Sequence, residues 1–200
     1  MGQTAFAHDL AGYGVAVADG VVGRARDIYF DDRQWKVRYV VVALRHGLTT
    51  RPVLVSPVCV LGVDAAARRL QTSLTREQIL HGPDIDADRP VSRQHEIALH
   101  EYYGISLYWT GENPASRWGD PHLRSIRAIR GYTVIGRDAA VGHVADFSID
   151  VGAWTLVDVV VARHHWPGAS RVRLAVDAIE RVSWMGKAVY LDARVLDRTA

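Results

Sequence analysis

The sequence predicts a mainly β protein made of two small β-barrels in tandem, with short helices in the segment that connects them. The first observation behind this prediction is an internal repeat. Gly12 to Leu70 matches Gly131 to Val189 at a constant offset of 119 residues (131 − 12), with no gap. Self-similarity at a fixed offset is typical of chains that fold as repeated units. The second observation is a series of short β-branched segments separated by turns.

The two copies share their landmark residues. These are a glycine, an aspartate and a tryptophan, namely Gly23, Asp27 and Trp35 in the first copy and Gly142, Asp146 and Trp154 in the second. A run of valines follows each tryptophan, and such a run predicts a central strand that is covered on both faces. The paired aspartates could do acid–base chemistry. Their equivalent positions instead favour a structural role, in which each carboxylate accepts hydrogen bonds from a nearby turn.

Within each copy, the pattern predicts five or six short strands. In the first copy they lie around Tyr13–Val17, Gly23–Phe30, Trp35–Ala43, Val53–Val55 and Arg69–Thr72, with counterparts in the second copy. The dipeptide Asp19-Gly20 predicts a tight turn. So many short strands favour a closed or nearly closed barrel, because closure removes unpaired strand edges.

The repeat divides the chain into four parts. Residues 1–11 form an N-terminal arm, 12–82 the first barrel, 83–128 a connecting segment with a short helix, and 129–200 the second barrel. Thr75–Gln78 has the form of a capping box and predicts a short helix that ends near Gly82. Within the connecting segment, a helix is expected from Ser92 to a stop at Gly104.

Composition limits the classes of function. Apolar residues make up 48% of the chain and charged residues 23%, as in ordinary soluble globular proteins. The formal net charge of +2 is too small to predict a nucleic-acid-binding surface. Cys59 is the single cysteine and is expected to be a buried hydrophobe, which suits a reducing compartment. No transmembrane segment or secretory signal is recognised. We therefore expect a cytoplasmic protein, or one peripheral to a membrane complex.

The sequence predicts no catalytic residue, no metal site and no cofactor. His95 and His100 lie five residues apart, so on a helix their side chains point ~140° apart and do not converge on one ion. The acidic run Asp84–Asp88 lacks the glycine and the closing glutamate of a calcium loop. His164 and His165 are expected in an exposed loop. No phosphate-binding loop or serine–histidine–aspartate order is present.

Two groups of residues are candidates for binding a partner. The aromatic group belongs to the connecting segment and contains Tyr102, Tyr103, Tyr108 and Trp109. Aromatic side chains are enriched among the residues that dominate protein interfaces. The basic group belongs to the first copy and contains Arg24, Arg26, Lys36 and Arg38. Its counterparts in the second copy carry no permanent charge, so these positions distinguish the two copies.

The pattern of Gly12-Tyr13, Gly23-x-x-x-Asp27, Trp35 and the valine run resembles the PRC-barrel domain. That domain is shared by the H subunit of purple-bacterial photosynthetic reaction centres and the C-terminal part of a bacterial ribosome-maturation factor. Both copies fit, and the connection, with Tyr102-Tyr103-Gly104, is similar to that of bacterial tandem PRC-barrel proteins. The resemblance covers about residues 12–198. It implies a non-catalytic barrel that docks onto proteins.

Three hypotheses of function follow. The first is an interaction or assembly module that acts as an adaptor for an unidentified protein partner. The second is an RNA- or ribosome-associated maturation or stress factor. The third is a metal-dependent hydrolase that uses the histidines. A homodimer is a further hypothesis, since small barrels have strand edges to cover.

Overall fold

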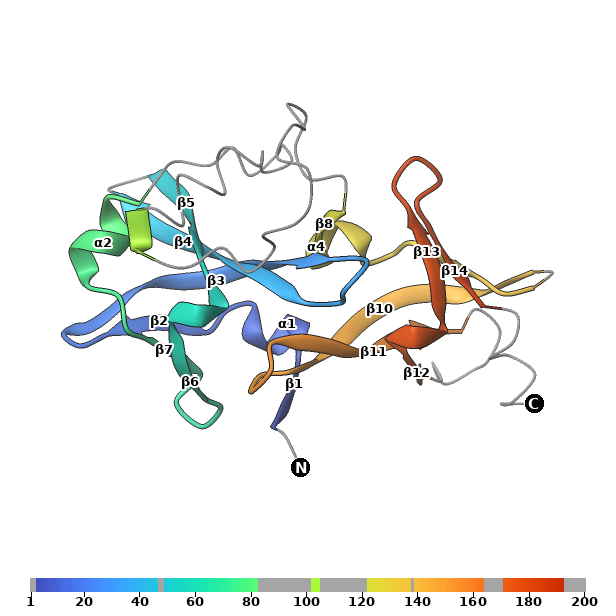
Figure 1. The fold of residues 1–200 in the computed structure, drawn as a ribbon, viewed down its shortest axis with the longest axis horizontal. Coiled ribbons are helices and arrows are strands. Elements are labelled where there is room, and N and C mark those ends of the chain that lie inside the picture. The colour runs from blue at the N-terminus through green and yellow to red at the C-terminus, as the bar shows by residue number, and fades with distance from the viewer. Residues whose placement is uncertain are drawn as a thin grey trace.

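The structure is a computed structural model, and it describes residues 3–46, 49–82, 102–104, 122–137, 139–163 and 171–192. It is mainly β, with two seven-stranded sheets, one for each repeat (Figure 1). The strands of the first repeat are β2 (Gly14–Val17), β3 (Gly20–Asp31), β4 (Val37–His46), β5 (Thr49–Val55), β6 (Val60–Asp64) and β7 (Arg69–Thr72). Those of the second are β9 (Thr133–Ile135), β10 (Ala140–Asp150), β11 (Thr155–Ala162), β12 (Arg171–Ala175), β13 (Ile179–Ser183) and β14 (Ala188–Leu191).

The two sheets have the same topology. Their orders are β5-β4-β3-β2-β7-β6 and β12-β11-β10-β9-β14-β13. Neighbours are antiparallel except for β2 with β7 and β9 with β14, which are parallel. Each order is an open path, with β5 and β6 at the ends of the first and β12 and β13 at the ends of the second. The mainly β fold is confirmed, whereas closure into barrels stays a prediction.

Short helices connect the strands. They are α1 (Ala7–Leu10), α2 (Arg76–Leu80), α4 (Ile126–Ile129) and the 3-10 turns η1 (Pro57–Cys59) and η2 (Val176–Ala178). The predicted capping box at α2 is confirmed, because the Gln78 amide N–H donates to Thr75 Oγ1 at 3.2 Å and the Thr75 N–H donates to Gln78 Oε1 at 2.8 Å. Tyr102 and Tyr103 are helical and Gly104 follows with φ 65°, as the predicted helix stop requires.

One further strand in each sheet comes from the other half of the chain. β1 (Thr4–Phe6) pairs with β10 of the second repeat, and β8 (Leu123–Ser125) pairs with β3 of the first. Thr4 lies opposite Asp150 and Leu123 opposite Asp31, so both pairings obey the offset of the repeat. The repeated structure therefore begins at Thr4 and Leu123, ahead of Gly12 and Gly131. The first strand of each repeat pairs with the sheet of the other repeat (Figure 1).

A pseudo-twofold axis passes between Trp35 and Trp154. The Val37 N–H donates to the Trp154 carbonyl at 2.8 Å, and the Leu156 N–H donates to the Trp35 carbonyl at 2.7 Å. Both tryptophans have positive φ, 55° and 51°, which non-glycine residues rarely adopt. The left-handed turn directs each tryptophan carbonyl toward the other repeat. The landmark tryptophans therefore mark the contact between the repeats.

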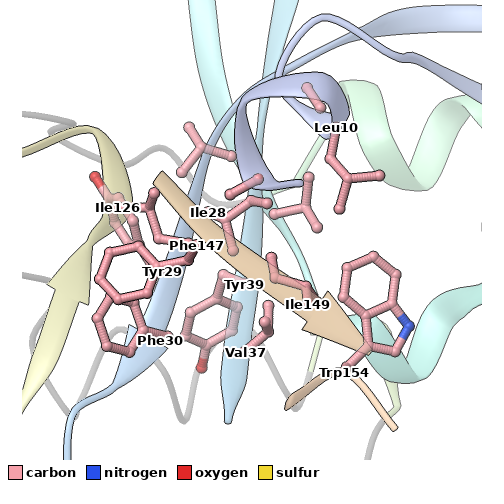
Figure 2. Packing of buried hydrophobic residues seen from close by; sticks show 14 of the residues in the cluster. Leu10, Ile28, Tyr29, Phe30, Val37, Tyr39, Ile126, Phe147, Ile149 and Trp154 are labelled. Atoms are coloured by element: carbon pink, nitrogen blue, oxygen red, sulfur yellow. The ribbon is translucent and has the colours of Figure 1, made fainter. Parts of the chain in front are cut away.

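Buried side chains of both repeats form one hydrophobic core. Figure 2 shows Ile28, Phe30 and Tyr39 of the first repeat together with Phe147 and Ile149 of the second. The rings of Phe30 and Phe147 have centroids 5.6 Å apart. The valine runs Val40–Val42 and Val159–Val161 are buried throughout, as predicted. Because the core is shared, we expect the two repeats to fold as one unit.

Among the helices in the described ranges, none has the length and apolar character needed to cross a membrane.

Candidate functional site

The landmark aspartate of the first repeat binds the arm that arrives from the second. We call the contact of Leu123–Ile129 with β3 the β3 joint. There Asp27 Oδ2 accepts from the Ser125 hydroxyl at 2.5 Å, and Oδ1 accepts from the backbone N–H groups of Arg127 at 3.1 Å and Ile28 at 2.8 Å. Burial raises the pKa of Asp27 above its usual value, although these hydrogen bonds oppose the shift.

The landmark aspartate of the second repeat does the same for the N-terminal arm. We call the contact of Thr4–Leu10 with β10 the β10 joint. Asp146 is buried, and its Oδ2 accepts from His8 Nδ1, while His8 Nε2 lies 3.2 Å from Asp9 Oδ1. Asp146 Oδ1 has no hydrogen-bond partner among the residues that the structure describes. His8 and Arg127 are equivalent in the repeat, so both aspartates receive the start of a short helix.

The carboxylates of Asp27 and Asp146 do accept hydrogen bonds, but the prediction that the donors belong to a nearby turn is wrong. Each carboxylate accepts from residues at least 98 positions away in the chain. The turn role belongs to other residues: Asp31 accepts from the Arg33 and Gln34 N–H groups, and Asp150 accepts from those of Gly152 and Ala153. The landmark aspartates thus fasten the two repeats together.

The landmark glycines are required by close packing of strands. A Cβ on Gly23 would lie 2.7 Å from the Ala43 carbonyl oxygen, and one on Gly142 would lie 2.2 Å from that of Ala162. Real Cβ atoms do not approach that closely. The glycines therefore serve the fold and carry no chemistry.

The β3 joint has an additional charged cluster. Asp32 accepts from Arg124 Nε at 2.6 Å and pairs with His122 Nδ1 at 2.8 Å. Its counterpart in the second repeat is Val151, which keeps only the backbone hydrogen bond, from its N–H to the Gln3 carbonyl at 3.0 Å. The ion pair between Arg124 and Asp32 therefore has no counterpart in the β10 joint, where Ala5 and Val151 stand at these positions.

The structure does not bring the four predicted basic residues together. Arg24 and Arg26 are exposed on β3, whereas Lys36 is exposed at the contact between the repeats. The strand rise places Lys36, which lies beside Asp31, roughly 20 Å along β3 from Arg24.

Arg38 requires a correction, because it is only 2% exposed and pairs with Asp31 at 3.3 Å. It is the additional residue of a β-bulge, since Tyr29 pairs with Tyr39 and Phe30 with Val37. A bulge redirects a side chain that strict alternation would place on the other face. Arg38 is therefore a structural residue rather than part of an exposed patch.

The aromatic group is also divided. Tyr102 is 41% exposed, while Tyr103 is buried, and their rings meet edge to face at 5.2 Å. A Cβ on Gly82 would lie 2.6 Å from the Tyr103 hydroxyl, so Tyr103 packs against the end of α2. Burial raises the pKa of Tyr103 far above its usual range. Tyr103 therefore anchors its segment to the first repeat, whereas Tyr102 is exposed to solvent. Tyr108 and Trp109 lie outside the described residues.

Two exposed apolar sites were not predicted as surface features. One is Trp184 with Met185, in the turn between β13 and β14, and the other is Val58 with Leu61, on η1 and β6. The first repeat has Ala65 and Ala66 at the positions of Trp184 and Met185. The second repeat has Asp177 and Glu180 at the positions of Val58 and Leu61. A comparison of the two copies at their fixed offset shows that these positions differ between the repeats, but it does not show that they are exposed.

No cluster of three or more metal-ligating side chains occurs in the part of the chain that the structure describes. His95, His100, Asp84–Asp88 and His164-His165 lie outside that part. Cys59 is buried as predicted, and burial raises the pKa of its thiol.

No family model matches this chain, and a comparison with proteins of curated function finds no match.

Proposed function

We propose that this chain is a non-catalytic interaction or assembly module, with each sheet closing into a small barrel of the PRC type. The motif residues support this proposal. Gly23, Asp27 and Trp35 and their counterparts are residues that the fold itself uses, for close strand packing, for the joints and for the contact between repeats. A pattern made of such residues identifies a fold, and the function must reside elsewhere on the molecule.

One observation carries the functional part of the proposal: the repeats share their topology and buried valine runs, and they differ at exposed positions. The valine runs and the topology are the same in both. Exposed positions differ in kind, since Arg24 is matched by His143, Lys36 by Thr155 and Ala66 by Met185. Two joined copies of one fold thus present two chemically distinct surfaces. Two distinct surfaces on one folded unit are what we expect of a protein that binds a partner.

The test is affinity capture of the tagged protein from its native cells, with soluble and membrane fractions analysed separately. Three variants are compared with the wild type: Tyr102→Ala, Arg26→Glu, and Arg69→Glu as a control that reverses an exposed charge elsewhere. The proposal expects one protein partner that is retained by the control and lost with Tyr102→Ala or Arg26→Glu. Turnover of a substrate by the purified protein, abolished by point changes in one cluster, would contradict it.

The same experiment tests the RNA-associated alternative. Recovery of ribosomal proteins or RNA, with binding that falls steeply as salt rises, would favour that function over the adaptor.

A further inference from the structure

The turn between β13 and β14 presents two large apolar side chains to solvent. Met185 is 97% exposed and Trp184 is 57% exposed. The hairpin extends away from the rest of its sheet, as the red ribbon in Figure 1 shows. Isolated exposed apolar residues are common, but an adjacent tryptophan and methionine at the tip of a hairpin indicate a site that contacts another molecule or a membrane.

The fold does not require these two residues. In the first repeat, the turn between β6 and β7 has Ala65 and Ala66 at the same positions. Both turns have the same backbone: Lys187 has φ 44° and its counterpart Arg68 has φ 50°. Both are also capped alike, since Ser183 Oγ accepts from the Gly186 N–H at 3.1 Å and Asp64 Oδ1 accepts from the Ala67 N–H at 2.8 Å. Trp184 and Met185 therefore serve a purpose other than forming the turn.

The charged residues of this hairpin are sorted along its length. Lys187 is exposed at the tip, and Arg181 is exposed on the second strand pair from the base, where its guanidinium lies 3.5 Å from the centroid of the Tyr190 ring. The acidic residues Glu180 and Asp192 lie at the base, next to the Ile179–Leu191 pair. In the first repeat, Gly62 replaces Arg181 and Asp64 replaces Ser183, while Arg68 stands for Lys187 and Arg69 for Ala188. The apolar tip of the second repeat is thus flanked by cations.

We propose that this tip docks on an anionic lipid surface, with Trp184 and Met185 in the interfacial layer and with Lys187 and Arg181 against the phosphate groups. Tryptophan favours the membrane–water interface, and basic side chains are attracted to anionic headgroups. A flexible methionine adapts to the disordered acyl boundary. A convex tip of two residues is small beside the ~800 Å² per partner of a standard protein interface. This inference is independent of the proposed function, because it uses none of the candidate partner-binding residues.

The test is co-sedimentation of the full chain with phosphatidylcholine vesicles, with and without phosphatidylglycerol. The wild type is expected to bind the anionic vesicles. The double variant Trp184→Ala/Met185→Ala copies the alanines of the first repeat, so it should fold normally and bind about tenfold more weakly or worse. Lys187→Glu should also weaken binding. The control Val58→Ala/Leu61→Ala shortens two side chains that are 66% and 69% exposed on the first repeat, and it should bind like the wild type.

A depth measurement makes the test specific. Brominated lipid should quench part of the tryptophan emission of the wild type, and Trp184→Phe should remove that part. No binding to anionic vesicles, or equal binding by the double variant, would overturn the proposal. The proposal would also be overturned if the double variant only converted a dimer to a monomer in light scattering, because the tip would then contact a second copy of this chain.

Discussion

The β3 joint and the β10 joint share one backbone geometry and use different side chains. In both, a three-residue strand and a single helical turn from one repeat lie against the long strand of the other. In the β3 joint, Asp27 is held by a hydroxyl and two backbone N–H groups. In the β10 joint, Asp146 accepts from the His8 imidazole and, at 3.4 Å, from the His8 backbone N–H. Apolar packing and strand pairing are thus common to both arm contacts, while the polar side chains that hold each arm can differ.

The joints also differ in charge around the exchanged strand. The β3 joint adds the cluster of Asp32, His122 and Arg124, whereas the β10 joint has Phe6 under the Arg173 guanidinium at 4.7 Å. Partly buried, hydrogen-bonded ion pairs contribute more than exposed ones. We therefore expect the β10 joint to open more readily than the β3 joint.

The largest expected loss of stability comes from truncating the apolar side chain that anchors each arm. Leu10 of α1 and Ile129 of α4 are equivalent and fully buried. Leu10→Ala and Ile129→Ala should each lower the free energy of unfolding by ~2–5 kcal/mol, because each leaves a cavity in the shared core. Urea unfolding measures both. A loss below ~1 kcal/mol for Leu10→Ala alone would show that the N-terminal arm is not an integral part of the core.

The next effect concerns the landmark glycines. Gly142→Ala brings a Cβ to 2.2 Å from the Ala162 carbonyl oxygen, and Gly23→Ala brings one to 2.7 Å from that of Ala43. Overpacking of this kind costs ~1–3 kcal/mol or more, and we expect the greater loss for Gly142→Ala. Urea midpoints of the two variants make the comparison. The opposite order would mean that β11 yields more easily than β4.

A smaller difference is expected between the two carboxylate partners. His8→Ala removes the imidazole donor of the buried Asp146 and leaves it one long backbone donor, the N–H of residue 8 at 3.4 Å, while Asp146 Oδ1 is already without a hydrogen-bond partner among the described residues. Ser125→Ala leaves Asp27 two backbone donors. We expect a loss of ~2–3 kcal/mol for His8→Ala and ~1 kcal/mol for Ser125→Ala. Equal losses in thermal or urea unfolding would remove this distinction between the joints.

The smallest effect is a dependence on pH at the β3 joint. Burial raises the pKa of Asp27 above its ordinary value of 3.8, so the folded state binds the proton more tightly than the unfolded state. The stability that Asp27 contributes is therefore fully present below pH 3.8, and it is lost as the pH rises through the folded-state pKa. A tenfold difference in proton affinity between the two states corresponds to ~1.4 kcal/mol.

The matched variant is Asp27→Asn, which cannot titrate. The difference in free energy of unfolding, wild type minus Asp27→Asn, should fall as the pH is raised from below 3.8 to neutral. A difference that is constant or that grows with pH would contradict the raised pKa.

Local features of this fold were readable from the sequence. The offset between the copies matched the strands of one repeat to those of the other, and the valine runs predicted the buried central strands. The capping box at Thr75 predicted α2. These features depend on near neighbours in the chain, so the residues themselves are sufficient to predict them.

Long-range features were not readable. β1 and β8 share no residue, because Thr-Ala-Phe stands in one and Leu-Arg-Ser in the other, so the repeat seemed to begin at Gly12. Their pairing depends on which strand edge is open in the folded molecule. Arg38 was expected in the basic group that could bind a partner, and the bulge opposite Tyr29 and Phe30, which places it in the interior, depends on the pairing of two strands.

Exchanged arms and a shared core make the two repeats one cooperative unit. Amide hydrogen exchange of Phe147→Ala tests this cooperativity most directly, because Phe147 lies on β10 and packs against Phe30 of the first repeat. The substitution should cost ~3–5 kcal/mol, and the amides of β4 and β11 should lose protection by the same amount. If β11 lost protection while β4 kept that of the wild type, the repeats would be separate domains and not one cooperative unit.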